Sequence, residues 1–272
     1  MSEDEQRGSD ECSATSSTRR IAGPQVANAC YFRSTAATGR RKALLKITDR
    51  CDLRCAHCFV SATAAGDDMR VDSLARAIPR LVAARVANVT ITGGEPLVHP
   101  KLTEILSLLR EECLEVTVCT NAVALTDELI ERALGLGCIR FNVSLDGVTA
   151  DSHGRFRGDR GSFDATIRNT RRLADAGLLK GVLSTPNSLA DPSEYEQLYE
   201  LVDELGGEYL LMNPLSSFGR GILTRSRFEA DTNTMMTIKA GVSRHLGPEK
   251  PEAVFIRFPN PSLALREHRI II

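Results

Sequence analysis

The stretch Ala43-Leu-Leu-Lys-Ile-Thr48-Asp-Arg-Cys51-Asp-Leu-Arg-Cys55-Ala-His-Cys58 decides the fold, because it joins a strand to a cluster of thiols. Its first six residues are mostly apolar and β-favouring, which predicts a short strand. Three cysteines then follow within eight residues, at the spacing CxxxCxxC. A tight loop of this spacing can direct three thiolates towards one point, as iron–sulfur ligation requires. The stretch therefore predicts a metal-binding loop at the end of a strand.

A strand followed by a helix recurs along the chain around this loop. Apolar runs and helical spacing predict strands at 43–48, 88–92, 115–120, 140–145, 179–185 and 208–212, and helices at 73–84, 102–112, 126–136, 163–176 and 193–205. Strands that alternate with helices form a parallel sheet with right-handed crossovers. Six such units fit either a doubly wound sheet or a partial barrel, and periodicity leaves both open. In both folds the catalytic and ligand-binding residues lie at the C-terminal ends of the strands.

Cap residues and composition divide the chain into three parts. Thr126 and Asp191 are placed to cap helices, and Pro192 suits a first helical position. Residues 1–41 are polar and small, which predicts a disordered tail. We expect one domain over 42–221. After Arg220 the pattern weakens, and 222–272 is interpreted as a C-terminal extension or a truncated module, with one further strand in AVFIRF at 253–258.

Composition excludes several classes of protein. Lys plus Arg (34) nearly equals Asp plus Glu (35), and Trp is absent, so nothing favours nucleic acid or an anionic membrane as a partner. No apolar run reaches the roughly 20 residues that cross a bilayer, and the acidic start lacks the features of a secretory signal. We therefore expect a cytoplasmic protein. Its eight cysteines would stay reduced there, so the clustered ones are interpreted as metal ligands.

The cysteine triplet alone leaves two metals open. Three ligands on a four-iron cluster leave one iron free for a small molecule. A structural zinc needs four ligands, and no second CxxC pair follows. His57 adjoins Cys58, and adjacent residues seldom reach the same ion. These features favour a cluster over zinc.

Further motifs carry a resemblance to a known family. The triplet is followed by ITGGEP at 91–96, NVSLDG at 142–147 and HGRFRG at 153–158. In this order the motifs resemble the radical S-adenosylmethionine (SAM) superfamily, in particular molybdenum-cofactor cyclases, peptide maturases and anaerobic sulfatase-maturing enzymes. The resemblance covers residues 42–221 and implies an α/β fold, a partial (β/α)6 barrel. It also implies a [4Fe–4S] cluster that cleaves SAM reductively to a 5′-deoxyadenosyl radical.

The resemblance also implies roles for individual residues. The metal ligands are Cys51, Cys55 and Cys58. The expected cofactor-binding residues lie at strand ends: Gly93, Gly94 and Glu95 at the methionyl amino group, Ser144 at the carboxylate, Asp146 at ribose or substrate, and Thr120, Asn121 and Met212 along the cavity wall. Asp146 could equally be a turn residue, and Met212 core filler. The catalytic candidates are Cys119, His153 and Arg157, of which Arg157 would anchor an anion or form a structural ion pair. A loop histidine such as His153 is more often exposed, and the scattered Cys113, Cys119 and Cys138 resemble small buried hydrophobes.

The substrate is less constrained than the cofactors. No cysteine follows Cys138, so we expect no auxiliary clusters of the SPASM type. This ranks a small-molecule or cofactor-type substrate ahead of a peptide. The alternatives are a peptide-modifying maturase and a non-enzymatic zinc- or cluster-binding module. A SAM-dependent methyltransferase is a third possibility, but it would not explain the cysteine triplet. The expected partner is a one-electron reductant such as flavodoxin or ferredoxin.

Overall fold

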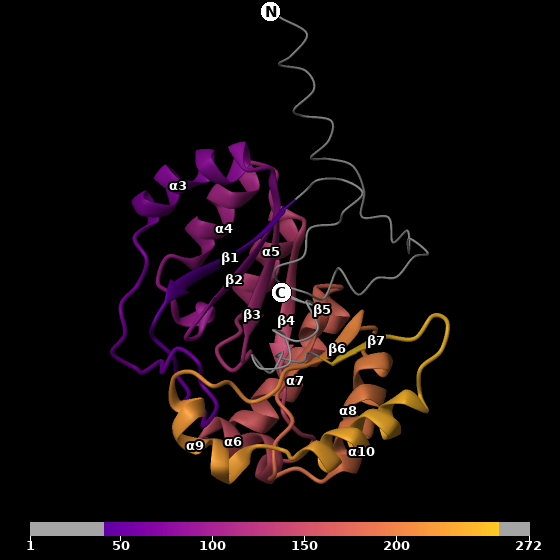
Figure 1. Cartoon of the computed structure of the whole chain (residues 1–272). Coiled ribbons are helices and arrows are strands. Elements are labelled where there is room, and N and C mark those ends of the chain that lie inside the picture. Colours follow the sequence, from indigo (N-terminus) through magenta and orange to yellow (C-terminus); the bar gives the residue numbers. More distant parts are fainter. Residues whose placement is uncertain (1–40, 256–272) are drawn as a thin grey trace, which may run out of the picture.

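The computed structural model describes residues 41–255, and its centre is one parallel sheet of seven strands (Figure 1). Neighbouring strands in the sheet follow the order of the chain from β1 to β7. A doubly wound sheet requires a reversal in strand order, so the sequential order identifies the partial barrel. β1 and β7 are the two edges, and the sheet is open between them in the described part of the chain. The strands are β1 (Arg41–Thr48), β2 (Val86–Gly93), β3 (Glu115–Thr120), β4 (Ile139–Ser144), β5 (Leu179–Ser184), β6 (Tyr209–Met212) and β7 (Glu252–Phe255).

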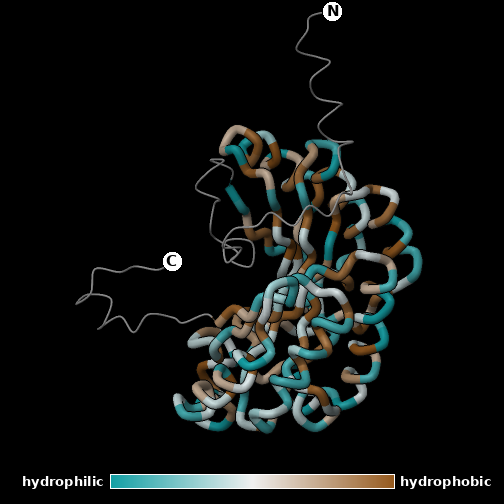
Figure 2. Tube along the Cα trace, turned by 90° about the vertical axis from the view of Figure 1, so that its right-hand side faces the viewer, coloured by the Kyte–Doolittle hydropathy of each residue, from teal (hydrophilic) through white to brown (hydrophobic). Residues whose placement is uncertain are grey.

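The main helices cover one face of this sheet and bury two apolar clusters against it. The first cluster joins β1–β5 to α3, α4 and α5, and the second joins β5 and β6 to α8 and α10. The helical turns in Figure 2 alternate between hydrophobic and hydrophilic residues, as expected for helices with one buried side. The helices are α3 (Val71–Ala83), α4 (Leu102–Glu111), α5 (Asp127–Leu136), α6 (Arg155–Arg157), α7 (Ser162–Asp175), α8 (Pro192–Glu204), α9 (Arg220–Phe228) and α10 (Thr232–Ser243), with a 3₁₀ turn η1 (Pro96–Val98) and a π-helical turn η2 (Ala150–Gly154).

Both predicted helix caps are confirmed. The Thr126 side chain accepts a hydrogen bond from the Leu129 backbone N–H at the start of α5. Asp191 accepts one from Ser193, while Glu194 reaches back to the Asp191 backbone, so α8 begins with a reciprocal capping box. Each side chain satisfies backbone donors that have no partner inside the helix.

The ends of the chain differ from the prediction or lie outside it. β1 begins at Arg41, two residues before the strand predicted at 43–48, and the rest of the predicted tail lies outside the described residues. Helices α9 and α10 were not predicted. β7 confirms the first part of the expected strand at 253–258, and residues 256–272 lie outside the described range. Within residues 41–255, no helix is both long and apolar enough to cross a membrane.

The two faces of the sheet explain where some predicted residues lie. Met212 points to the helical side and is fully buried beside Leu145 and Leu210, so it is core filler and offers no surface to a cofactor. Cys113 and Cys138 are exposed, which makes the prediction of buried thiols wrong for both. Each sits in the turn after a helix with a positive φ angle, a place that brings the side chain to the surface.

Candidate functional site

The cysteine loop follows β1 and folds back against the C-terminal edge of the sheet. The Cys51 N–H donates to the Thr63 carbonyl at 2.9 Å, which closes the loop on itself. The Ala56 N–H donates to the Phe156 carbonyl at 2.8 Å, which ties the loop to α6. Cys55 is buried and the other two cysteines are partly exposed. The three sulfurs therefore lie on a backbone that the protein holds from two sides.

Each of the three sulfurs accepts one hydrogen bond. The Leu53 N–H donates to Cys51 Sγ at 3.4 Å, and the Ala62 N–H donates to Cys58 Sγ at 3.4 Å. The Arg157 guanidinium donates to Cys55 Sγ at 3.9 Å. Donors of this kind stabilise thiolate ligands of iron–sulfur clusters and tune their potentials.

The acidity of the thiols fits a site that binds metal. Burial raises the pKa of Cys51 to about 12, and burial also raises the pKa of Cys55. Both thiols are therefore protonated in the metal-free chain, and a metal would displace the protons. Within residues 41–255, no three His, Cys, Asp or Glu side chains form a group that could hold one metal ion. Three cysteine thiols on one short loop are the donor type that iron–sulfur clusters use.

The predicted glycine pair holds two backbones together. A Cβ atom on Gly94 would lie 2.0 Å from the Arg50 carbonyl oxygen, and one on Gly93 would lie 2.3 Å from that of Thr48. The Gly94 N–H donates to Thr48 and the Glu95 N–H to Arg50, both at 2.8 Å. The structure shows that these glycines approach the segment that enters the cysteine loop, and their contact with the methionyl amino group stays a prediction.

A first network connects the loop to β2 and β3. The Glu95 carboxylate is buried and accepts hydrogen bonds from Thr120 Oγ1 at 2.6 Å, the Asn121 N–H at 2.6 Å and the Leu97 N–H at 3.0 Å. The Asn121 side chain in turn donates to Asp52 Oδ1, inside the loop, at 2.7 Å. Burial raises the pKa of Glu95 to about 7, even though the three donors favour its charged form. We call this set the Glu95 network.

A second network connects the loop to β4 and β5. The Arg157 Nε donates to the Asp146 carboxylate at 2.6 Å, and both residues are buried. The Thr185 N–H donates to the other Asp146 oxygen at 2.7 Å. Burial opposes ionisation of Asp146, but the Arg157 charge, the two nearby histidines and the Thr185 N–H together lower its pKa. We call Asp146, Arg157, Thr185 and Cys55 the Asp146 network; in it Asp146 is a structural ion-pair partner.

Two histidines lie beside the second network. His153 is fully buried, not exposed as expected, and its Nδ1 accepts from the Asp146 N–H at 3.1 Å. The acceptor role of Nδ1 assigns the proton of the neutral ring to Nε2, which has no hydrogen-bond partner among the described residues. Burial lowers the pKa of His153 to about 3 and that of His57 to about 4. The His57 ring stacks on Phe156 with centroids 4.4 Å apart.

The remaining predicted residues differ in how closely they approach the loop. Ser144 ends β4 and is partly exposed. Cys119 is partly buried on the sheet face opposite the helices, where the Asn142 side-chain amide donates a hydrogen bond to its Sγ at 3.8 Å. Arg220 holds the loop by donating to the Cys55 and Ala62 carbonyls at 2.9 and 2.7 Å. The prediction omitted Asp52, although its place between two ligand cysteines was a usable signal.

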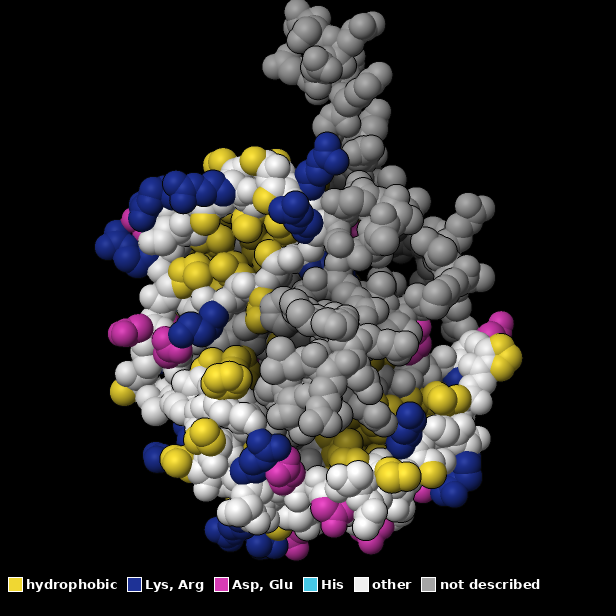
Figure 3. Space-filling view, in the orientation of Figure 1, with side chains coloured by type: hydrophobic (Ala, Val, Ile, Leu, Met, Phe, Trp, Pro, Cys, Tyr) yellow, Lys and Arg dark blue, Asp and Glu magenta, His cyan; other side chains and the backbone are white. Residues whose placement is uncertain are grey.

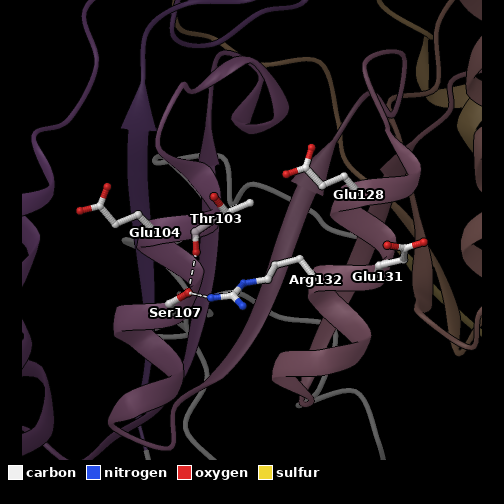
Figure 4. Close-up of a pocket in the computed structure, with 6 residues that line it drawn as sticks. All are labelled: Thr103, Glu104, Ser107, Glu128, Glu131 and Arg132. Carbon is white, nitrogen blue, oxygen red and sulfur yellow. Dashed lines mark hydrogen bonds between the residues drawn. The ribbon is translucent and has the colours of Figure 1, made fainter.

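A surface pocket lies away from these networks, between α4 and α5 (Figure 4). In Figure 4, Arg132 reaches across it to Ser107, with its Nη2 donating to the hydroxyl at 2.7 Å. None of the predicted site residues lines the pocket: its lining is Thr103, Glu104, Ser107, Glu128, Glu131 and Arg132.

Comparisons with known proteins identify the family. A sequence profile described as the Radical SAM superfamily matches residues 45–205, which include the cysteine loop and both networks. The chain belongs to the radical SAM superfamily. Enzymes of this superfamily bind a [4Fe–4S] cluster and SAM, and they require a reductant.

Curated relatives agree with this assignment, and a solved structure shows a similar fold. The chain is 31% identical over 183 residues to the antilisterial bacteriocin subtilosin biosynthesis protein AlbA of Bacillus subtilis, covering 66% of this chain and 40% of AlbA. It is 30% identical over 178 residues to the AdoMet-dependent heme synthase of Methanosarcina barkeri, covering 65% of this chain and 51% of that protein. The fold is similar to that of Streptococcus suis SuiB, with a TM-score of 0.67 and 16% identity, over 84% of this chain and 52% of SuiB. The chain thus spans about half the length of these relatives.

Proposed function

We propose that this protein cleaves SAM reductively at a [4Fe–4S] cluster held by Cys51, Cys55 and Cys58, and abstracts hydrogen from a small-molecule or cofactor-type substrate. The observation that carries the proposal is that each sulfur accepts one hydrogen bond on a loop fixed by two buried networks. When bound, the cluster would supply one electron to the sulfonium of SAM and a free iron for its amino and carboxylate groups. The chain's own residues would position both groups and limit access of water.

We propose that Ser144, Thr120 and Asn121 contact SAM. Ser144, Thr120 and Asn121 end neighbouring strands at the edge where the loop lies. Asn121 is linked to the loop through Asp52. We propose that the Glu95 carboxylate faces the methionyl ammonium, since it is ionised above a pH of about 7 and an ammonium would favour ionisation further. In the cytoplasm, where we place the protein, reducing conditions would keep the ligand thiols available.

Anaerobic reconstitution tests the reaction. Wild-type protein should bind about four irons per chain and release 5′-deoxyadenosine from SAM when dithionite is added. Cys55→Ala should lose both properties, whereas Cys138→Ala, which alters an exposed thiol after α5, should retain them. A colourless protein that holds one zinc would support the binding module instead. S-adenosylhomocysteine as the product would support a methyltransferase.

The substrate class needs a separate test. A peptide is the second candidate, because AlbA is a bacteriocin biosynthesis protein and the structure of SuiB has been solved with its precursor peptide SuiA. The heme synthase, by contrast, is named for a cofactor. Added substrate should accelerate 5′-deoxyadenosine release, so cofactor precursors and gene-neighbour peptides can be compared in one assay. If only a peptide accelerates the release, a peptide substrate would rank ahead of a small-molecule or cofactor-type substrate.

A further inference from the structure

Helix α9 lies directly on the back of the cysteine loop. The Arg220 N–H donates to the Cys58 carbonyl at 2.9 Å, and Thr224 Oγ1 donates to the Ala56 carbonyl at 2.9 Å. Phe228, at the end of α9, packs with Phe156 in a small apolar cluster under the loop. Figure 1 shows α9 beside α6, on the side where the strands end. The outer surface of α9 is therefore the outer surface of the proposed cluster site.

This surface exposes four large apolar side chains, which we call the α9 patch: Phe59, Phe218, Ile222 and Leu223. Their exposed fractions are 52%, 74%, 58% and 81%. The described chain exposes nine large hydrophobic side chains, so nearly half of them gather here. The backbone next to Phe218 touches that of Phe59, because a Cβ atom on Gly219 would lie 2.6 Å from the Phe59 backbone. Hydrophobic and Lys/Arg side chains adjoin one another over the α9 region of Figure 3.

Arginines lie within the two segments that carry the α9 patch, and Asp52, Asp67 and Glu229 flank these segments. Residues 53–66 and 213–228 contain Arg54, Arg220, Arg225 and Arg227 and no Asp or Glu. Arg225 is paired with Glu229, which follows α9. Arg54 and Arg227 are exposed, and the Arg227 guanidinium lies 4.9 Å from the Phe228 ring centroid. Aromatic and aliphatic side chains with an arginine rim are typical of a protein interface that selects an acidic partner.

We propose that the α9 patch is the docking surface for an acidic one-electron donor protein. The inference rests on the proposed function, which consumes one electron for each SAM cleaved; the docked donor is oxidised by one electron and the cluster is reduced by one. The α9 patch covers the ligand loop, and Phe59 is bonded to the ligand Cys58. A docked donor would therefore stand closer to the cluster here than over the outer helices. A second copy of this chain fits less well, because its Arg54 and Arg227 would meet the same charges.

The test compares two electron sources in the reconstituted holoenzyme. Leu223→Ser and Arg227→Glu are matched with the control Leu134→Ser, which alters a 52% exposed leucine on α5. With a reduced acidic flavodoxin as the probe, both patch variants should lose about tenfold in the rate of 5′-deoxyadenosine formation and in affinity for the flavodoxin. With dithionite, which needs no docking, all variants should match the wild type. Added salt should slow the wild type with flavodoxin and leave the dithionite rate unchanged.

Other outcomes would overturn the proposal. Equal flavodoxin rates in patch variants and wild type would remove the patch from electron delivery. An equal loss with both reductants would assign α9 to the structure of the cluster loop, and conversion of a dimer to a monomer by Leu223→Ser would identify a subunit contact. Flavodoxin affinity is measured without turnover, which separates the two proposals. If the patch variants lose flavodoxin binding but dithionite-reduced wild type does not cleave SAM, the proposed function is wrong. If the patch variants bind flavodoxin as tightly as the wild type, the docking surface is wrong.

Discussion

The buried pair of Asp146 and Arg157 shows how far single residues could be interpreted from sequence. Both were predicted site residues, and an ion pair was one of the two roles foreseen for Arg157. Asp146 was assigned to ribose or substrate, because nothing in NVSLDG announces a partner eleven residues later. The pairing depends on how β4 and α6 pack, which is a property of the tertiary structure. The burial of His153 was missed for the same reason: its motif looks like a loop in a single sequence, and its contacts depend on the tertiary structure.

Removing the arginine should damage both the fold and the site. Arg157→Met leaves the Asp146 carboxylate buried without its cation, at a cost of roughly 3 kcal/mol in the free energy of unfolding. It also removes the donor to Cys55 Sγ, so the variant should bind less iron, or hold a cluster with a lower midpoint potential by EPR titration. Arg155→Met, an exposed arginine on the same turn, is the control for urea unfolding and iron content. If Arg157→Met had the same unfolding free energy and cluster midpoint potential as the wild type, the Asp146–Arg157 pair would have no role at the cluster site.

The buried Glu95 should make stability depend on pH. Its pKa is about 7 in the folded chain against an ordinary 4.5, so between these values the folded chain holds a proton that the unfolded chain has released. Stability from this group is therefore fully present below pH 4.5 and lost as pH rises to about 7, by roughly 3 kcal/mol at about 1.4 kcal/mol per pKa unit. Glu95→Gln should lack this contribution. Buried His57 and His153, whose pKa values are lowered, make stability change with pH in the opposite direction. The measurement is therefore the difference between the unfolding free energies of wild type and Glu95→Gln from pH 5 to 7.5. A difference that stays constant over this range would contradict the raised pKa of Glu95.

At the scale of elements, the predictable helices are those with strong local signals. The helices α5 and α8 were predicted to within one residue at each end, because a cap residue marks the start and an apolar stripe defines the length. Helix α9 lacks that stripe: Ile222 and Leu223 face solvent, and the helix is held by hydrogen bonds to the cysteine loop. Its position depends on a distant segment, which local periodicity does not record.

The capping box of α8 gives a prediction at this scale. Asp191→Ala removes the side chain that accepts from the Ser193 N–H and leaves only the backbone half of the capping box, in which residue 191 donates to Glu194. The free energy of unfolding should fall by about 1 kcal/mol, as for other N-cap replacements. Urea unfolding monitored by far-UV circular dichroism measures the change, and Gln197→Ala, an exposed position inside α8, is the control. An unchanged midpoint in Asp191→Ala would show that tertiary packing alone fixes the start of the helix.

At the scale of the whole molecule, the order of the strands carries the fold. Alternation in the sequence predicted parallel strands, but it left the doubly wound sheet and the partial barrel open until the resemblance chose between them. The sequential order from β1 to β7 confirms that choice. It brings the cysteine loop, which follows β1, beside α9, which follows β6, although 162 residues separate Cys58 from Arg220. The site is thus assembled from both ends of the described sheet.

This arrangement predicts that metal loss is felt in one part of the molecule. The sheet between β2 and β5 is stabilised by a large apolar cluster that makes no use of a metal. The loop at 49–66 has no helix and little apolar burial, and α9 depends on it through hydrogen bonds. Chelation of the reconstituted protein should therefore raise amide hydrogen exchange in 49–66 and α9 by about tenfold or more, and leave β2–β5 protected. Uniform loss of protection across the sheet would mean that the cluster supports the whole fold, whereas unchanged exchange in the loop would mean that the two buried networks hold it without metal.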